Sequence, residues 1–502
     1  MNKLSRREFL AMSAVGAASG LLYGKTGFAQ MGGGGGATII NPLPNGVFKD
    51  PPVMPLLRNG NVVSGALVEA GAAQVNIAGT NANLLAYNGI FPAPTIRVKT
   101  GDILKLTFKN ALPALGTNII GHDMSMTNLH THGWHVSPAG NADNILLHFA
   151  PGEEFLFEYD LSKQPGGLLG FYHPHAHGTV AEQVWRGMSG GALVVEDETP
   201  ALAGYETHLL LIKDISLAGS DPAPYTLDDY RMGKTGTIVM VNGQVNPVLP
   251  IRPGQVTRLR IVNSCNARYL RLALEGHTLH LVGCDGGLLD KPYPITEILL
   301  TPGERIDVLV KADQTSRTYR LLSLPYGNIN QQVTLLTLSY GGTPVADSLP
   351  QSIPSSVADK VKFLKTLNRA AFRRVNLALQ FVMGMGGVIQ GAINGGVFGV
   401  NTFVLTSRIG TYEVWVVKND TMMDHPFHQH VNGSVVLSIT GGDQNYAALY
   451  STSPALKDTV NVPPMGTLTM LVPVENYTGD TVFHCHILEH EDIGMMGLWR
   501  LV

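Results

Sequence analysis

Hydrophobic and polar residues alternate along three short segments of the chain. Between Gly101 and Asn110, leucine and phenylalanine alternate with lysine and threonine, which is the period-two pattern of a half-buried β-strand. The same arrangement, in which an asparagine follows a glycine by nine residues, returns at 254–263 and 410–419. An Asn-Gly pair, typical of a turn, precedes each copy. We therefore predict that one β-sheet unit occurs three times.

The three copies are evenly spaced. Their opening glycines lie 153 and 156 residues apart, and a length of 502 residues suits about three domains. The 57 glycines and 30 prolines suit many short strands joined by turns, and the 44% of apolar residues is sufficient for large cores. We predict an all-β fold of three β-sandwich domains, at residues 59–197, 198–345 and 346–502.

The N-terminus has the composition of an export signal. A basic head is followed by an apolar stretch at 9–22 and by small residues before position 30. The segment around Arg6 and Arg7 resembles a twin-arginine signal, with an ordinary secretory signal as the alternative. We predict a twin-arginine signal peptide at 1–29, a Gly/Pro-rich linker at 30–58, and a periplasmic mature protein that does not span the membrane.

Charge and cysteine content exclude several classes of protein. The formal net charge is −3 and only 15% of residues are charged, which gives no reason to expect nucleic acid or an anionic membrane as a partner. Three cysteines are too few for a disulfide-rich scaffold. Cys265 and Cys284 could pair in an oxidising compartment, a point that their spacing leaves open. Cys485 lies inside a histidine cluster.

Eight of the 17 histidines form four His-x-His pairs, which are His130/His132, His173/His175, His428/His430 and His484/His486. Two pairs fall in the first predicted domain and two in the third. Residues i and i+2 of a strand point to the same face, so each pair offers two imidazoles to one side. Eight imidazoles are too many for one ion and predict a cluster of about three metal ions at a domain interface. Incidental structural histidines are the alternative.

A second metal site is predicted on the other face of the last pair. The Cys485 thiolate points away from its two histidine neighbours, and His425, His490 and Met495 lie at nearby positions. Two histidines, one thiolate and a weak thioether are the ligands of a blue electron-transfer copper. Zinc, the alternative, would favour a closed set of four ligands without the methionine. Met495 as an ordinary core residue is a further alternative.

At these residues the chain resembles the three-domain multicopper oxidases, which include laccases and cuprous oxidases. The segments that carry the resemblance are 129–133, 171–178, 425–430 and 484–490, and the likeness extends over essentially the whole mature chain. It implies three consecutive cupredoxin-like Greek-key β-sandwiches. It also implies four copper ions, of which one is type 1, one is type 2 and two are type 3.

The resemblance further implies a role for each candidate ligand. The type 1 ion would be held by His425, Cys485, His490 and Met495, the type 2 ion by His130 and His428, and the type 3 ions by His132, His173 and His486 and by His175, His430 and His484. Electrons would enter singly at the type 1 ion, and dioxygen would be reduced to water at the other three.

Two acids are candidates for supplying protons. Glu491 directly follows His490 and matches the family's proton-relay acid. Asp143 resembles the acid that follows the first histidine pair, although the intervening loop is longer and Asn144 stands where glycine is expected. A solvated surface acid is the alternative for either residue.

The resemblance leaves the reducing substrate open. We expect a monomeric, laccase-type oxidase of phenols or aromatic amines; the alternative is a metallo-oxidase of Cu(I) or Fe(II) in copper tolerance. The short, Gly-rich stretch at 381–398 contains only Met383 and Met385, which favours a type 1 site open to aromatic donors. Met422 and Met423 precede His425, and Met423, two residues before this ligand, resembles part of a cuprous-oxidase site, which favours Cu(I). The alternative is that both methionines pack under the copper loop. A copper-free scaffold is disfavoured because no ligand is missing, and a two-domain nitrite reductase because of the third repeat.

Overall fold

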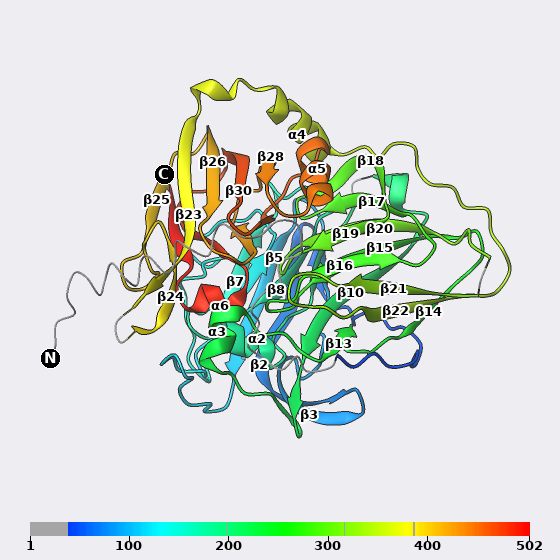
Figure 1. Ribbon diagram of the computed structural model, residues 1–502, viewed down its shortest axis with the longest axis horizontal. Coiled ribbons are helices and arrows are strands. Elements are labelled where there is room, and N and C mark those ends of the chain that lie inside the picture. The colour runs from blue at the N-terminus through cyan, green and yellow to red at the C-terminus, as the bar shows by residue number, and fades with distance from the viewer. Residues whose placement is uncertain (1–38, 198, 316, 385–386) are drawn as a thin grey trace, which may run out of the picture. The chain divides into compact units, whose positions relative to one another are not determined.

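The computed structural model describes residues 39–197, 199–315, 317–384 and 387–502. The predicted signal peptide and the start of the linker lie outside these residues. The described chain consists mainly of β-strands joined by turns and a few short helices (Figure 1). No helix among the described residues has the length and apolar character needed to cross a bilayer.

The first β-sandwich contains the first repeat. One sheet has the order β1-β2-β5-β7, with β3 paired to β2, and consists of β1 (Leu57–Asn59), β2 (Val62–Ile77), β3 (Thr80–Tyr87), β5 (Ile103–Ala111) and β7 (Glu154–Asp160). The facing sheet has the order β4-β9-β8-β6 and consists of β4 (Ile96–Val98), β6 (His130–His132), β8 (Leu169–His173) and β9 (Ala192–Val195). The apolar face of β5 packs into the core between the sheets, as its alternation predicts.

The second β-sandwich is the largest by strand number. Its six-stranded sheet runs β13 (Ile238–Val241), β10 (Glu206–Ile215), β15 (Val256–Asn263), β20 (Arg305–Lys311), β17 (Leu279–Cys284) and β18 (Gly287–Ile295). Its five-stranded sheet runs β14 (Val248–Ile251), β22 (Val333–Tyr340), β21 (Thr318–Leu324), β16 (Leu270–Leu274) and β19 (Glu297–Leu300). Both faces of β15 are buried, because Arg258 and Arg260 on its polar face pair with Asp307.

The third β-sandwich carries the last two histidine pairs. One sheet runs β24 (Ile389–Ile393), β23 (Arg373–Met383), β26 (Thr411–Asn419), β30 (Thr467–Val474) and β28 (Val435–Thr440). The other runs β25 (Val404–Ser407), β32 (Met496–Leu501), β31 (Gly479–Cys485), β27 (His425–Gln429) and β29 (Thr459–Val462). Trp415, Phe427, Phe483 and Trp499 pack together between these sheets.

The asparagine that ends each repeat has one structural role. Asn110, Asn263 and Asn419 are fully buried, and the side-chain amide of each donates to backbone carbonyls of two later segments of its own sandwich. The Oδ1 atom of each accepts the backbone N–H two residues later. Because a buried backbone carbonyl must be paired, the asparagine fixes where the strand ends and the loop begins.

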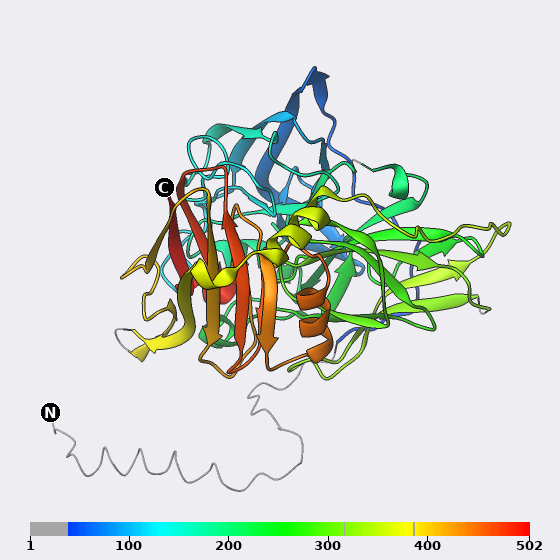
Figure 2. The same cartoon turned by 90° about the horizontal axis from the view of Figure 1, so that it is seen from above.

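Short helices lie between the sandwiches. Helices α2 (Val180–Trp185), α3 (Leu227–Met232) and α6 (Leu488–Asp492), one from each sandwich region, lie side by side (Figure 1). Helix α4 (Ser356–Thr366) contacts β18 and β28 and so bridges the second and third sandwiches, while α5 (Gln444–Thr452) packs on β28 (Figure 2). The predicted all-β, three-sandwich architecture is confirmed, and the domain limits stay a prediction.

Candidate metal centres

Strand pairing brings the four histidine pairs together. In the first sandwich, β6 and β8 place His130 opposite His173, and in the third, β27 and β31 place His428 opposite His484. All eight imidazoles are at most 2% exposed. The rings of His130 and His430 stack at 4.0 Å between centroids, and those of His132 and His428 also stack at 4.0 Å. The two terminal sandwiches therefore meet at one buried group of imidazoles.

Three imidazoles direct nitrogen atoms at one point. The Nε2 atom of His484 lies 3.2 Å from the Nε2 atoms of His175 and of His430. Burial lowers the pKa of all three well below its usual value, so the rings are neutral. Three nitrogens at this spacing cannot all be satisfied by hydrogen bonds to one another, which fits a shared metal ion.

His132 also has neighbouring imidazoles on two sides. It lies next to His486, and it comes within metal-binding reach of His173 together with His130. The Nδ1 atom of His132 lies 3.2 Å from the Nε2 atom of His486. His173 donates from Nδ1 to the carbonyl of Pro174, which leaves its buried Nε2 atom without a hydrogen-bond partner. A metal ion is the partner that these ring nitrogens lack.

The remaining pair, His130 and His428, is oriented from outside. Asp143 accepts from the Nδ1 atom of His130 at 2.9 Å, and the carbonyl of Asp458 accepts from the Nδ1 atom of His428 at 3.0 Å. Both Nε2 atoms are buried without a partner. Such outer contacts fix the tautomer that directs Nε2 to a metal.

The cysteine centre lies within the third sandwich. The Sγ atom of Cys485 lies 3.3 Å from the Nδ1 atom of His425 and 3.5 Å from that of His490, and the two nitrogens are 3.2 Å apart. Met495, fully buried, joins this group through backbone hydrogen bonds to Cys485 and His490. The donor set and its burial fit copper.

The cysteine centre is covered on its outer side. The Nε2 atom of His425 lies 2.7 Å from the Oγ1 atom of Thr421, and that of His490 lies 3.2 Å from the carbonyl oxygen of Arg231 in α3. Both rings are fully buried, and Phe381 packs against both. Sequence reasoning sought such a cover only in the third domain, whereas α3 belongs to the middle sandwich, and no local pattern at 227–232 indicates it.

Both candidate acids lie at the histidine cluster, and neither is a surface acid. The oxygens of Glu491 are 3.3 Å from the Nδ1 atom of His175 and 3.4 Å from that of His484. Burial, and then the charges of Asp492 and Glu489, raise the pKa of Glu491 well above its usual value. Burial would raise the pKa of Asp143 too, but His130 and the Thr131 N–H hold it below its ordinary value.

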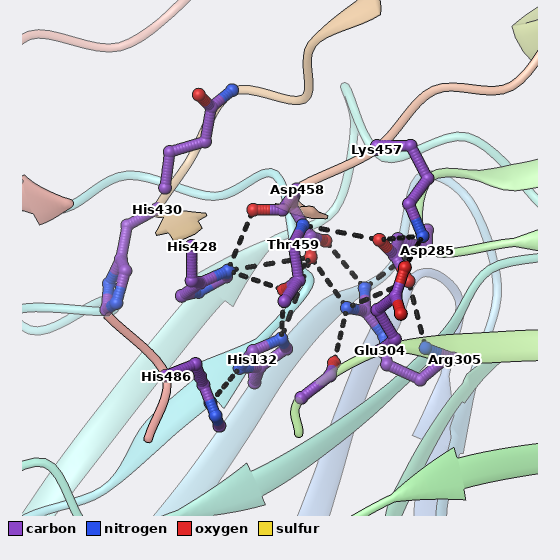
Figure 3. Close-up of polar contacts among 12 residues, drawn as sticks. His132, Asp285, Glu304, Arg305, His428, His430, Lys457, Asp458, Thr459 and His486 are labelled. Atoms are coloured by element: carbon purple, nitrogen blue, oxygen red, sulfur yellow. Dashed lines mark hydrogen bonds and ion pairs between the residues drawn. The ribbon is translucent and has the colours of Figure 1, made fainter. Parts of the chain in front are cut away.

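Sequence reasoning missed Asp458 and Arg305. Asp458 lies 3.6 Å from His132 and 3.5 Å from His428, and Arg305 of the middle sandwich pairs with it (Figure 3). Neither residue belongs to a His-x-His pattern, so only the tertiary structure identifies them. Cys265 and Cys284, whose pairing the sequence left open, are separate buried thiols.

A cavity opens onto the cluster between the first and third sandwiches. Its volume is about 340 Å³, and its lining includes His130, His428, Asp458, Trp134 and Lys360. The cluster is therefore reachable by a small molecule such as dioxygen.

Three β-sandwiches and two centres of ligands that suit copper are the features of a copper redox enzyme. Comparison with known proteins identifies the family. Family models described as multicopper oxidase match residues 69–200, 212–343 and 364–500. The chain belongs to the multicopper oxidase family and is a copper-dependent oxidoreductase that uses dioxygen.

Similar proteins agree with this assignment. The multicopper oxidase mco of Staphylococcus haemolyticus is 30% identical over 83% of both chains. A laccase of Bacillus subtilis is 27% identical over 82% of this chain and 89% of its own. A multicopper oxidase of Campylobacter jejuni described as a metallo-oxidase superposes with a TM-score of 0.77, at 27% identity, covering 92% of this chain and 97% of its own.

Proposed function

We propose that the chain binds four copper ions with the ligands that the sequence predicts. The type 1 ion takes His425, Cys485, His490 and Met495, the type 2 ion takes His130 and His428, one type 3 ion takes His132, His173 and His486, and the other takes His175, His430 and His484. The observation that carries this proposal is the convergence of buried ring nitrogens, of which the Nε2 atoms of His130, His173 and His428 have no hydrogen-bond partner.

Bound copper supplies one-electron acceptance at the cysteine centre and reduction of dioxygen at the cluster, where O₂, four electrons and four protons give two waters. The chain supplies the connection, because His484 and His486 are covalent neighbours of Cys485. The route between the two centres therefore runs through bonds of β31 and the residue after it.

Glu491 is the proposed proton carrier. Its buried carboxyl lies between two cluster histidines, and burial raises its pKa well above the usual value, which favours the protonated form. A protonated acid in that position can deliver protons to oxygen reduction. Asp143 has a different role in the proposal: its carboxylate stays ionised and orients His130.

The proposed electron donor is a small metal ion, with Cu(I) as the preferred case. The imidazoles of His425 and His490 are both fully buried. Their outer nitrogens contact Thr421 and Arg231, which favours a small donor over a bulky phenol. Exposed methionines lie on the segments around this centre: Met422 is 71% exposed, Met383 is 70% exposed and Met465 is 58% exposed. The backbone N–H of Met465 donates to the carbonyl of Thr421, next to Met422. Soft thioethers suit Cu(I).

Phenol oxidation is the second candidate. The stretch at 381–398 is short and Gly-rich, and laccases are among the similar proteins. A phenol would then transfer its electron across the cover.

Steady-state kinetics with Cu(I), Fe(II) and a phenol, measured side by side on the copper-loaded protein, decides between the donors. We expect kcat/KM to be highest for Cu(I), and Met422→Ala to lower it severalfold while phenol turnover is unchanged. A higher kcat/KM for the phenol than for Cu(I), with no effect of Met422→Ala on Cu(I) oxidation, would instead support the laccase hypothesis.

The proposal also places the mature enzyme in the periplasm as a monomer, exported through the twin-arginine signal at 1–29. N-terminal sequencing of the protein from the periplasm should find cleavage near residue 29. Intact, cytoplasmic chain would contradict this part of the proposal.

A further inference from the structure

The middle sandwich reaches the histidine cluster without supplying a ligand. Within the part of the chain that the structure describes, its histidines lie outside both centres. Arg305, the first residue of β20, is nevertheless fully buried at the cluster (Figure 3). A buried guanidinium is costly unless every N–H is paired, so its partners indicate what it does.

All five N–H groups of Arg305 are used. Its two terminal nitrogens donate to the two carboxylate oxygens of Asp458, each at 2.6 Å. The other donations go to the backbone carbonyls of Leu169 at 3.0 Å, Gly303 at 3.0 Å and Asp285 at 3.1 Å. Leu169 lies in the first sandwich, Gly303 and Asp285 in the second, and Asp458 in the third. One side chain therefore joins all three sandwiches.

Asp458, which Arg305 holds in place, contacts the histidine cluster. Its carboxylate lies 3.5 Å from the Nδ1 atom of His428 and 3.6 Å from the Nε2 atom of His132, and its backbone carbonyl accepts from His428. The hydroxyl of Thr459 donates to the same carboxylate at 2.9 Å and lies 3.0 Å from His428. Asp458 thus contacts the outer side of one imidazole from the first sandwich and one from the third.

Two glycines allow this close approach. A Cβ atom on Gly133, directly after His132, would lie 2.3 Å from an Arg305 nitrogen. A Cβ atom on Gly303 would lie 2.9 Å from the ring of His486. The turn before β20 therefore packs directly against His486, and the Arg305 side chain packs against the backbone next to His132.

We propose that Arg305 is a positioning residue for the copper cluster: through Asp458 it holds His428 and His132 in the orientation that binds copper. The inference rests on the proposed ligand assignment. The type 2 ion depends on it most, because that ion has only two protein ligands and His428 is one of them. The middle sandwich thereby makes cluster assembly depend on the docking of all three sandwiches.

Arg305→Lys tests this role, because lysine keeps the charge but cannot bind both carboxylate oxygens in a planar fork. Arg260→Lys is the matched control. Arg260 is also buried, donates to Asp307 at 3.0 Å and to the first-sandwich carbonyl of Gly167 at 2.8 Å, and contacts no cluster histidine. Asp458→Asn is a second test that leaves the arginine in place.

The readouts are copper per chain, the type 2 electron paramagnetic resonance signal, copper loss to a chelator, the blue type 1 band, and thermal unfolding of the copper-free chain. We expect Arg305→Lys and Asp458→Asn to lose type 2 copper about 10- to 100-fold more readily than wild type, with the blue band intact. Arg260→Lys should change unfolding alone.

An unchanged type 2 signal and copper ratio in both Arg305→Lys and Asp458→Asn would overturn the inference, as would an equal copper loss in Arg260→Lys. If Arg305→Lys or Asp458→Asn does not fold, the other variant is compared with Arg260→Lys. If neither folds while Arg260→Lys folds normally, Arg305 acts in folding and the positioning role is overturned. Failure of the proposed function would be seen separately, as a wild-type protein without type 2 copper.

Discussion

The two metal centres differ in how many parts of the chain must meet to form them. His425, Cys485, His490 and Met495 all belong to the third sandwich, and three of them lie within eleven consecutive residues. The cluster instead takes half of its histidines from the first sandwich and half from the third, and Arg305 and Asp458 connect it to the second. The ligands of the cysteine centre thus come from one sandwich, whereas the cluster forms only where the sandwiches dock against one another.

The largest expected effect comes from the single-core centre. Cys485→Ser should remove the blue absorption band and reduce turnover to the detection limit, because the thiolate both binds the type 1 ion and joins it to the cluster. Cluster copper should remain, since Cys485 is not among its proposed ligands and His484 points to the opposite face of β31. Visible absorption and copper analysis measure both effects. A blue, active variant would show that the two centres are misassigned.

Glu491→Gln should separate the two centres kinetically. Removing the acid should slow reoxidation of the reduced enzyme by dioxygen by about 10²- to 10⁴-fold, the usual contribution of a positioned proton donor. Reduction of the type 1 centre should keep its wild-type rate, because Glu491 faces the cluster. Stopped-flow absorption follows each half-reaction. Reoxidation at the wild-type rate would assign proton delivery to another group.

Asp143→Asn should affect the first-sandwich half of the cluster alone. The amide can no longer hold the Nδ1 proton of His130 as the carboxylate does. Copper affinity of the type 2 site should fall about 10- to 100-fold, as for other groups that orient a metal-binding histidine. Chelator titration followed by copper analysis measures it, with the blue band as internal control. Equal loss from both centres would indicate general unfolding instead.

The smallest expected effect comes from a contact between the first and third sandwiches. His135 donates to the carbonyl of Val431 at 2.6 Å, and its other ring nitrogen pairs with Asn476 at 2.7 Å. His135→Ala should weaken docking by about 1 kcal/mol per lost hydrogen bond. In mild denaturant, cluster copper should then be lost earlier than in wild type while the blue band persists. Simultaneous loss of both signals would mean that the sandwiches unfold as one unit.

The sequence predicted what depends on local spacing. The His-x-His spacing predicted that the eight imidazoles meet, with the Cys485 thiolate opposed to its neighbours. Only His130 and His132 both lie on a strand; the second histidine of each other pair lies just past the strand end. The buried asparagines Asn110, Asn263 and Asn419 explain why the repeat that revealed three sandwiches is so regular.

Features that arise from docking could not be predicted in this way. Arg305 is far from Asp458 along the chain, and α3 reaches His490 from the middle sandwich. The expectation of a type 1 centre open to aromatic donors was drawn from 381–398 alone, whereas Thr421 and Arg231, which lie outside that stretch, also contact the two imidazoles. Long-range contacts of this kind leave no period in the sequence.

Copper stoichiometry of the purified wild-type protein, measured together with its electron paramagnetic resonance and visible spectra, tests the central claim most directly. We expect four copper ions per chain, a blue band from the type 1 ion, and resonance signals from the type 1 and type 2 ions but not from the coupled type 3 pair. A colourless protein, or one that binds a single ion or zinc in place of copper, would contradict it.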